Sequence, residues 1–539
     1  MTDSPAPEPD PRFVWWKHGV IYQVYPRSFQ DTDGDGVGDL AGVIARLDYL
    51  VALGVDAVWL SPIFRSPMAD FGYDVADHTA IDPLFGDMAT FETLVAQAHA
   101  RGLKVILDYI PNHTSDQHPW FQASRADRGH PQRDWYVWRD GAPDGGPPNN
   151  WRGEFGGPAW TWDEASGQYY YHAFLPAQPD LNWRNPAVVT AMLDVLRFWL
   201  NRGVDGFRVD AIHHLFESED LADNPPNPAW RPQDPPTEAL LRVNTVDRPE
   251  THGAVAAMRR LLDSHGGERV LIGEAYLPLH RLMTYYGAAG DGFHLPFNFH
   301  LMTTAWTPEA IAGLIRAYEA ALPVGGWPNW VLGNHDRARL ASRLGRAQAR
   351  VAAMLLLTLR GAPTLYQGDE LGMTDVEIPP DRVRDPWEMN LPGLGLGRDP
   401  VRTPMLWNGG PNAGFSGAKP WLPLSPDWRD LHAVRQAAEA GSLLNLYQEL
   451  IALRRREPAL THGAYGPIAS DGTLLAYERR AKGERLLIIL ELGGQEAVCD
   501  TPAGVVLMST KGARIGEEAG GHLAIAANEG LIVRLSASA

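Results

Sequence analysis

The stretch Asp108-Tyr-Ile-Pro-Asn112-His113 closes an apolar run, and it is the first of four polar clusters on which the fold assignment depends. The other three are Gly206-Phe-Arg208-Val-Asp210, Gly273-Glu274-Ala-Tyr276 and Asn334-His335-Asp336. Each cluster ends a short, β-rich run of the kind that forms a buried strand. A carboxylate at the end of a buried strand costs too much desolvation energy to be incidental packing. The clusters therefore predict that several strand ends meet at one functional rim.

Strand-like and helix-like segments alternate through the first 370 residues. The expected strands are 20–25, 57–61, 104–109, 206–210, 270–274, 293–297, 330–333 and 364–366. Between them lie amphipathic segments, namely one with Val43, Leu47, Leu50 and Val51 at helical spacing, and 91–101, 188–202, 255–265 and 310–322. Eight strand–helix units in this order predict an α/β fold, a closed (β/α)8 TIM barrel whose chemistry lies at the C-terminal strand ends.

Two long excursions interrupt the barrel pattern. Residues 113–180 are rich in Trp, Gly, Pro and Tyr and are too long for a simple loop, which predicts an inserted subdomain after the third strand. Residues 371–430 form a second excursion over the active face. The barrel then comprises 15–112 and 181–462, closed by a helix at 443–456, after a flexible tail at 1–14.

After the barrel, the pattern changes to short alternating strands. The expected strands are 474–479, 486–492, 505–508, 523–526 and 531–535. Such a run predicts a small antiparallel β domain over 463–539.

Composition restricts the class of partner. The chain has 539 residues, 45% of them hydrophobic, and a net charge of −18, which argues against nucleic acid or an anionic membrane as partner. No apolar run approaches the roughly 20 residues of a membrane span. The single cysteine, Cys499, cannot form an internal disulfide and favours a cytoplasmic location. Some of the 19 tryptophans could form flat platforms for sugar rings, although most are expected to pack in cores and loops.

Three strand-end carboxylates match the needs of a glycosidase, which uses one carboxylate to attack and one acid to protonate the leaving oxygen. Arg208 and Asp210 share a face of their strand, and the guanidinium is expected to keep Asp210 ionised. Glu274 has uncharged neighbours, so desolvation would favour its acid form. The structural alternatives are a buried ion pair for Asp210, a strand-end cap for Glu274 and a helix N-cap for Asp336.

A separate loop, Asp31-Thr-Asp33-Gly-Asp35-Gly-Val-Gly-Asp39, resembles the start of an EF-hand. Alternate aspartates place several carboxylate oxygens around one hard cation, so a structural Ca²⁺ or Mg²⁺ site is expected. Gly42 at position twelve argues against a true EF-hand, and a metal-free Asx-turn is the alternative. There is no zinc spacing, no phosphate-cradling loop and no Gly-x-Ser-x-Gly elbow, so no organic cofactor is expected.

From about residue 15 onward, these clusters in this order resemble the α-amylase superfamily, glycoside hydrolase family 13. Finer motifs resemble its exo-acting α-glucosidase and oligo-1,6-glucosidase branch. They are Asp70-Phe-Gly-Tyr-Asp74, Gln178-Pro-Asp-Leu-Asn-Trp183, Arg337 after Asn334-His-Asp, and Gly397-Arg-Asp-Pro-Val-Arg402-Thr-Pro-Met. The Asp31–Asp39 loop is similar to that branch's metal loop, in which Val37 would offer a backbone carbonyl.

The resemblance implies a role for each matching residue. Asp210 would be the nucleophile, Glu274 the general acid/base, and Asp336 the carboxylate that binds and distorts the sugar. His113 and His335 would hydrogen-bond sugar hydroxyls. The remaining substrate contacts would be Tyr73 stacking on the ring with Phe174 beside it, Asp70 pairing with Arg402 to close the floor, and Phe155 bordering the mouth.

The implied function is a retaining, exo-acting α-glucosidase that takes sugar or alcohol acceptors in transglucosylation. Ala211 follows the nucleophile where a bulkier Val often accompanies α-1,6 activity, so maltose-type and sucrose-type substrates are favoured. Oligo-1,6-glucosidase, trehalose synthase and sucrose isomerase are the enzymatic alternatives, and a catalytically silent partner protein is the non-enzymatic one. A monomer or homodimer is expected.

Overall fold

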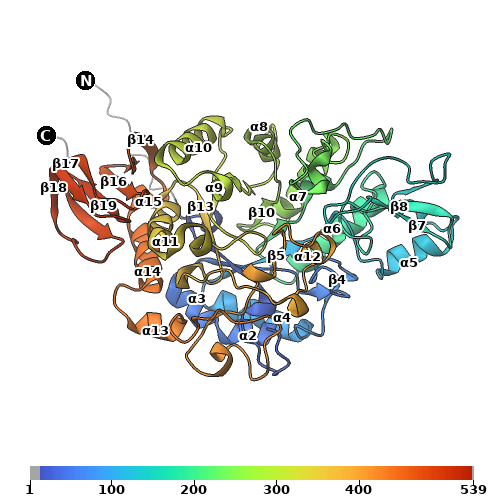
Figure 1. The fold of residues 1–539 in the computed structure, drawn as a ribbon, viewed down its shortest axis with the longest axis horizontal. Coiled ribbons are helices and arrows are strands. Elements are labelled where there is room, and N and C mark those ends of the chain that lie inside the picture. Colours follow the sequence, from blue (N-terminus) through green and yellow to red (C-terminus); the bar gives the residue numbers. More distant parts are fainter. Residues whose placement is uncertain (1–11, 537–539) are drawn as a thin grey trace.

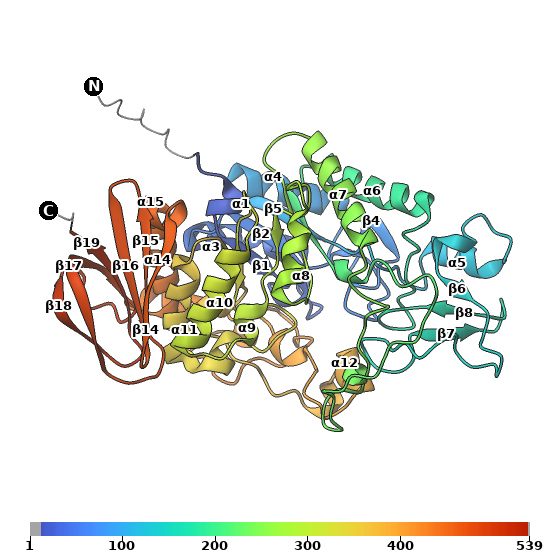
Figure 2. The ribbon, with the colours of Figure 1, turned by 90° about the horizontal axis from the view of Figure 1, so that it is seen from above.

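The computed structural model of the protein describes residues 12–536. The expected tail therefore lies almost wholly outside the described residues. The remainder of the chain forms a central barrel with a small sheet at either end (Figures 1 and 2).

Eight parallel strands form the barrel, as the sequence predicts. They are β1 (Ile21–Val24), β2 (Ala57–Leu60), β5 (Lys104–Tyr109), β9 (Gly206–Val209), β10 (Val270–Gly273), β11 (Leu295–Pro296), β12 (Asn329–Val331) and β13 (Ala362–Tyr366). Their order in the sheet is β11-β10-β9-β5-β2-β1-β13-β12. Strands therefore follow chain order around the ring, and the ring is nearly closed, with the two short strands β11 and β12 at its ends.

The barrel strands are apolar because both of their faces are buried. One set of side chains fills the barrel interior, including Ile21, Trp59, Ile106, Ile272 and Val331. The alternate set packs outward against the helices and joins the largest core of the molecule, including Tyr22, Val58, Val105, Leu271 and Leu332. Buried polar side chains such as Gln23 and Thr364 do occur within the strands, but the carboxylates of the four sequence clusters lie at or just beyond the C-terminal ends of their strands.

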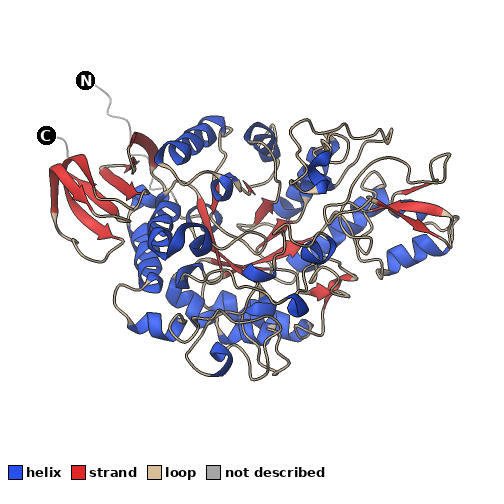
Figure 3. Ribbon diagram, in the orientation of Figure 1, coloured by secondary structure: helices blue, strands red, loops and turns tan. Residues whose placement is uncertain are grey.

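Helices surround the barrel (Figure 3). The main ones are α2 (Leu40–Ala45), α3 (Leu47–Leu53), α4 (Met88–Ala100), α6 (Pro186–Leu200), α7 (Glu250–Ser264), α10 (Pro308–Ala321), α11 (Leu340–Thr358) and α14 (Leu443–Arg456). Several begin at a side chain that accepts a backbone N–H bond, such as Asp87, Asn185, Thr307 and Ser442. Such N-caps each stabilise a helix by about 1 kcal/mol.

Helix α11 was not predicted. Its second half is buried on all sides, from Val351 to Thr358, whereas its first half exposes Ser342 and Arg346. Gly345 interrupts the first half with a positive φ of 76°. The amphipathic pattern of this helix is as strong as that of α10, so sequence analysis could have found it.

Shorter elements lie in the connections. The first excursion carries α5 (Pro119–Ala126) and a three-stranded sheet in the order β6 (Trp138–Arg139), β8 (Gln168–Tyr171), β7 (Trp160–Asp163), placed at one end of the molecule in Figure 1. The others are β3 (Phe64–Arg65), β4 (Asp77–Ile81), α1 (Trp15–His18), α8 (Leu279–Leu282), α9 (His300–Thr303), α12 (Pro386–Asn390), α13 (Ala433–Ala438) and α15 (Pro458–Thr461).

A six-stranded antiparallel sheet follows the barrel, as predicted. Its order is β14 (Ala464–Asp471), β15 (Leu474–Ala481), β16 (Glu484–Glu491), β19 (Gly530–Leu535), β17 (Ala497–Ser509) and β18 (Glu518–Ile525). Strand β14 was not expected, and each of the other five overlaps a predicted segment and begins at or before its first residue. Figures 1 and 2 show this sheet beside α10, α11 and α14, at the end opposite the three-stranded sheet.

Candidate active site

Strand register brings three carboxyl groups together, those of Asp108, Asp210 and Glu274. Asp108 on β5 and Ile272 on β10 both lie opposite Arg208 on β9, so Glu274, two residues after Ile272, lies level with Asp210. Arg208 Nη1 donates to Asp108 Oδ1 at 3.1 Å and to Asp210 Oδ1 at 2.8 Å, while its Nη2 lies 2.8 Å from Glu274 Oε1. One buried guanidinium therefore contacts all three carboxyl groups.

Ala211, the residue after Asp210, has an unusual backbone conformation. Ala211 has φ 44° and ψ 34°, in the left-handed region that non-glycine residues seldom adopt. This conformation turns its N–H toward Glu274 Oε2, at 3.0 Å. The strained turn thus fixes Glu274 beside Asp210, and a β-branched side chain would be harder to accommodate there.

Burial dominates the electrostatics of Asp210. Desolvation raises the pKa of Asp210 well above its usual value, Arg208 opposes this, and the nearby charges of Glu274 and Asp108 add to the rise. The predicted ion pair of Asp210 with Arg208 is present. Arg208 favours the ionised form of Asp210 as expected, but desolvation by burial acts in the opposite direction on its pKa.

Asp336 has the opposite balance. Burial alone would raise its pKa, but His335, Arg402 and Arg398 together hold the pKa of Asp336 well below its usual range. Arg402 Nη2 donates to Asp336 Oδ1 at 2.8 Å, and Arg398 Nη1 lies 3.5 Å from the same oxygen. Asp336 is therefore the firmly ionised carboxylate of the site.

The predicted pairing of Asp70 with Arg402 is wrong. Arg398 makes that contact, with Nη2 2.7 Å from Asp70 Oδ1, while its Nε lies 2.6 Å from Asp385 Oδ2. Arg402 pairs with Asp336 instead, and its Nε donates to the carbonyl of His335 at 2.9 Å. The network of Asp70, Arg398 and Asp385 forms the floor of the site, and its arginine lies inside the quoted Gly397–Met405 motif but was given no role.

His113, His335 and Tyr73 line the cavity beside the floor. Gln23 Nε2 donates to His335 Nδ1 at 2.8 Å, which leaves the proton on Nε2, 2.6 Å from the Tyr73 hydroxyl. Tyr73 in turn donates to Asp108 Oδ2 at 2.9 Å. Burial lowers the pKa of His113 to about 3 and that of His335 well below its usual value, so both rings are neutral.

A cavity of about 550 Å³ lies above this floor. Among the predicted site residues, those lining it are Asp70, Tyr73, His113, Phe155, Phe174, Asp210, Glu274, His335 and Asp336. Arg208 and Arg402 lie behind the lining, where they are buried and hold the carboxylates. Sequence reasoning missed further lining residues, namely Arg398 at the floor and Glu154, His214, Arg242 and Trp387 at the mouth.

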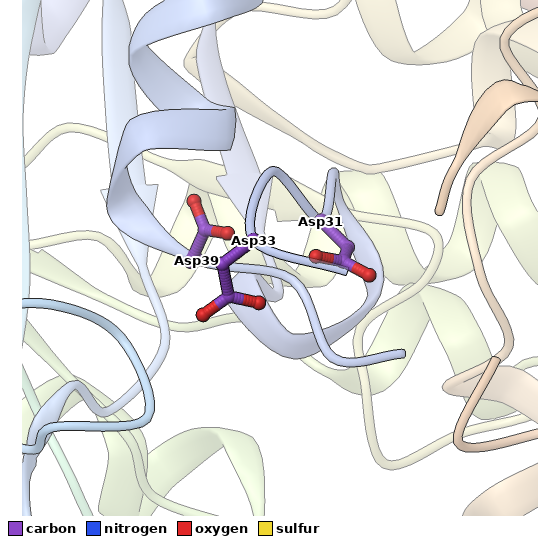
Figure 4. A group of neighbouring side chains, drawn as sticks. All are labelled: Asp31, Asp33 and Asp39. Atoms are coloured by element: carbon purple, nitrogen blue, oxygen red, sulfur yellow. The ribbon is translucent and has the colours of Figure 1, made fainter. Parts of the chain in front are cut away.

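The loop after β1 gathers three aspartates. Carboxylate oxygens of Asp31, Asp33 and Asp39 lie within 4.8 Å of one another. Figure 4 shows these three side chains on the loop. Three hard oxygen ligands suit Ca²⁺ or Mg²⁺. The predicted ligand Asp35 is not a member of this group, and its Oδ1 accepts a bond from the N–H of Val37 at 2.7 Å. Asp31 and Asp39 also accept N–H bonds within the loop, from Gly34 and Thr32, and Asp39 caps helix α2 by accepting the N–H of Gly42.

Within residues 12–536, no helix is long and apolar enough to cross a membrane.

Comparisons with known proteins agree with this architecture. The family model described as alpha amylase, catalytic domain, matches residues 23–463. A probable alpha-glucosidase of Rhizobium meliloti is 40% identical over 516 residues, which cover 93% of each chain.

Two solved structures resemble the whole fold. The alpha-glucosyl transfer enzyme XgtA is 41% identical with a TM-score of 0.92, covering 97% of this chain and 100% of its own. The trehalulose synthase MutB from Pseudomonas mesoacidophila MX-45 is 33% identical with a TM-score of 0.88, covering 98% and 100%. The resemblance noted in the sequence is thereby confirmed: the chain is a glycoside hydrolase that belongs to the α-amylase family and to its α-glucosidase branch.

Proposed function

We propose that this enzyme is a retaining, exo-acting α-glucosidase. The observation that carries the proposal is that Asp210 and Glu274 contact the same guanidinium, that of Arg208, at 2.8 Å each. Retaining glycosidases hold their two carboxyl groups about 5–5.5 Å apart, whereas inverting ones leave room for a water molecule between them. A shared guanidinium favours the shorter separation.

In the proposed mechanism, a carboxylate oxygen of Asp210 attacks the anomeric carbon while Glu274 protonates the departing glycosidic oxygen. The bond to the aglycone breaks and a covalent β-glucosyl ester of Asp210 forms. Glu274, now a carboxylate, deprotonates water, which attacks the same carbon and releases α-glucose. Asp336, kept ionised by Arg402, would hold sugar hydroxyls and favour the distorted ring.

Exo action is proposed from the closed floor. The Asp70–Arg398 ion pair, with Asp385 bound to the same arginine, would block the cavity beneath the catalytic carboxylates. A sugar chain cannot thread past such a pair, so only a non-reducing end would reach Asp210. Asp70 and Arg402 remain candidates for binding the terminal hydroxyls, each through the arginine network rather than by pairing with one another.

Linkage preference rests on Ala211. Its small side chain in a left-handed turn leaves space beside the leaving group, which supports α-1,4 glucosides and sucrose over α-1,6 glucosides. Another sugar or an alcohol could replace water in the second step and give transglucosylation. Hydrolysis of α-1,6 bonds, as by an oligo-1,6-glucosidase, is the nearer alternative.

Isomerisation is the second candidate, because the chain resembles the trehalulose synthase MutB along its whole length. An isomerase reuses the same carboxylates but retains the released sugar and rejoins it. In this chain Asp381-Arg-Val-Arg-Asp385 matches the arginine-rich, product-determining run of sucrose isomerases poorly, and its Asp385 is bound to Arg398. Hydrolysis is therefore favoured.

The test is glucose release from maltose, isomaltose, sucrose and trehalose by the wild type and by Asp210→Asn. Release from maltose or sucrose that is lost in the variant supports the proposal. Activity on isomaltose alone would reverse the linkage assignment, isomeric disaccharides in place of glucose would indicate an isomerase, and complete inertness would favour a silent partner protein.

The proposal also covers the metal loop, the cellular location and the oligomeric state. Asp31, Asp33 and Asp39 would hold a structural Ca²⁺ or Mg²⁺ that orders the loop after β1 and takes no part in the reaction. The single cysteine supports a cytoplasmic location, and a monomer or homodimer is proposed without nucleic-acid or membrane partners.

A further inference from the structure

The mouth of the cavity is built by three loops that are distant in sequence. The first excursion contributes Glu154 and Phe155, the connection between β9 and α7 contributes Arg242, and the second excursion contributes Trp387. Arg242 Nη1 contacts Glu154 Oε1, so an ion pair joins two of these loops across the cavity lining.

The backbone of Glu154 is held on both sides. Its N–H donates to the carbonyl of Ala173 at 2.8 Å, and its own carbonyl accepts a bond from Trp387 Nε1 at 2.8 Å. The neighbouring ring of Phe155 lies 5.2 Å from that of Trp387. Glu154 is therefore presented to the cavity from a fixed position rather than from a loose loop, which lowers the entropic cost of binding a ligand there.

Phe174 and His214 lie between the Glu154–Arg242 ion pair and His113 beside the floor. The ring of Phe174 packs 5.1 Å from His113 on the floor and 5.2 Å from His214. His214 Nε2 in turn lies 3.7 Å from Glu154 Oε1. A glucosyl unit seated over the floor would therefore have its neighbouring sugar beside Glu154 and Arg242.

Both partners are accessible to a ligand. The side chain of Glu154 is 18% exposed and that of Arg242 is 39% exposed, in contrast to the buried arginines of the floor. The carboxylate accepts hydrogen bonds and the guanidinium donates them, and a sugar hydroxyl does both. Because the two charges neutralise one another, the pair suits a neutral, hydroxyl-rich aglycone rather than an ionic one.

We infer that Glu154 and Arg242 form a specificity-determining clamp that binds the hydroxyls of the aglycone sugar and of a sugar acceptor. This inference rests on the proposed α-glucosidase function and names the part of the substrate that the mouth recognises. It assigns the two residues to the sugar beyond the scissile bond and gives them no part in holding the glucosyl unit itself.

Comparing two substrates separates the clamp from the floor. Maltose has an aglycone sugar, whereas the fluoride of α-glucosyl fluoride departs alone and leaves the mouth empty. For Arg242→Met we expect kcat/KM on maltose to fall roughly 10- to 100-fold, the loss typical of a hydrogen bond to a charged group. On α-glucosyl fluoride the same variant should stay within about twofold of the wild type, which also reports that it is folded.

Two further variants refine the test. Glu154→Gln keeps the shape and an acceptor oxygen, so it should show a smaller loss, again on maltose alone. Arg231→Met is the matched control, because Arg231 forms an exposed ion pair with Asp234 in the same loop as Arg242 but does not line the cavity. It should change neither substrate.

Acceptor use gives an independent readout. With α-glucosyl fluoride as donor and glucose as acceptor, Arg242→Met should lower disaccharide formation relative to hydrolysis. Equal losses on both substrates, or an unchanged kcat/KM on maltose, would overturn the clamp while leaving the wild-type glucosidase intact. Absence of wild-type activity on both substrates would instead remove the proposed function, and the clamp with it.

Discussion

The floor and the mouth of the cavity both contain arginine–carboxylate pairs, but the pairs differ in environment. At the floor, Arg398 and Arg402 are buried and bind Asp70, Asp336 and Asp385. At the mouth, Arg242 meets Glu154 where both side chains remain partly exposed. The first network is enclosed by the barrel rim and the second excursion, whereas the second is formed by two loops that meet over the opening.

The difference suggests a division of labour. Removing one partner of a buried ion pair costs about 3–5 kcal/mol, because the other charge is left desolvated, whereas an exposed pair contributes about 0–1 kcal/mol. Floor substitutions should therefore affect folding and every substrate together. Mouth substitutions should affect only the substrates that reach the mouth, and they are the tolerant positions at which specificity could change.

The largest effect is expected for Asp210→Asn, which removes the proposed nucleophile above the floor. Activity should fall on the order of 10⁴-fold or more, and equally for maltose and α-glucosyl fluoride, because both need the covalent step. Initial rates on the two substrates measure this. A residual rate within tenfold of the wild type would show that Asp210 is not the nucleophile.

Arg398→Met should come next, because it leaves Asp70 and Asp385 buried without their shared cation. We expect a loss of about 3–5 kcal/mol in the free energy of unfolding and weaker binding of both substrates. Urea unfolding and KM on each substrate provide the measurements. Arg384→Met is the control, since Arg384 is exposed and makes its contact to Asp399 through its backbone N–H. Equal stability of the two variants would contradict the role of Arg398.

Asp369, which follows β13, is a buried carboxyl group on which the effect of burial outweighs the charge of Arg339. Its Oδ1 has no hydrogen-bond partner, and burial raises the pKa of Asp369 to about 7 despite the opposing charge of Arg339. Because the folded pKa lies above the unfolded value, its contribution to stability is complete below pH about 4. That contribution is lost as pH rises through 7, by up to about 4 kcal/mol.

Asp369→Asn should therefore flatten the dependence of stability on pH in this window, while the wild type becomes less stable from pH 5 to pH 8. Urea unfolding at several pH values would measure the slopes. Parallel slopes for variant and wild type would contradict the assignment. Asp336 provides the contrast, because its arginine partners hold its pKa low and its ion pairs should persist throughout this range.

The smallest effect is expected at the metal loop, which is separate from both halves of the cavity. Calcium at a hundred times its Kd should add about 2.7 kcal/mol to the wild type, and chelation should remove it. Asp33→Asn should abolish this response and Asp35→Asn should retain it, since only Asp33 belongs to the oxygen cluster. Thermal unfolding with and without calcium measures the effect. An equal response in both variants would place the cation elsewhere.

The sequence predicts the catalytic carboxylates better than it predicts the arginine–carboxylate pairs of the floor and the mouth. Asp210, Glu274 and Asp336 could be found because each follows an apolar run, and strand periodicity carries them to one rim. Arg398 lay within a recognised motif, yet its pairing with Asp70 depends on how two loops fold against each other. Nothing in local sequence indicates such a pairing, and the same holds for Glu154 with Arg242.

Strands were easier to recognise than one of the helices. The strands were recognised because β-rich runs bounded by polar clusters are distinctive even when fully buried. Helix α11 was missed although its pattern is as amphipathic as that of α10. Gly345, which disfavours a helix in sequence analysis, lies within it with a positive φ.

The sharing of the Arg208 guanidinium among three carboxyl groups affects how many protons the site holds. Three acidic groups, Asp108, Asp210 and Glu274, surround one permanent positive charge, so the cluster would carry a net charge of −2 if every group were ionised. In a buried site that surplus favours the uptake of a proton. Burial raises the pKa of Asp108 to about 6, although Arg208, Tyr73 and Trp59 all donate hydrogen bonds to its oxygens. A cluster with this surplus negative charge would attract a hydrogen ion, which is the species that bond cleavage consumes.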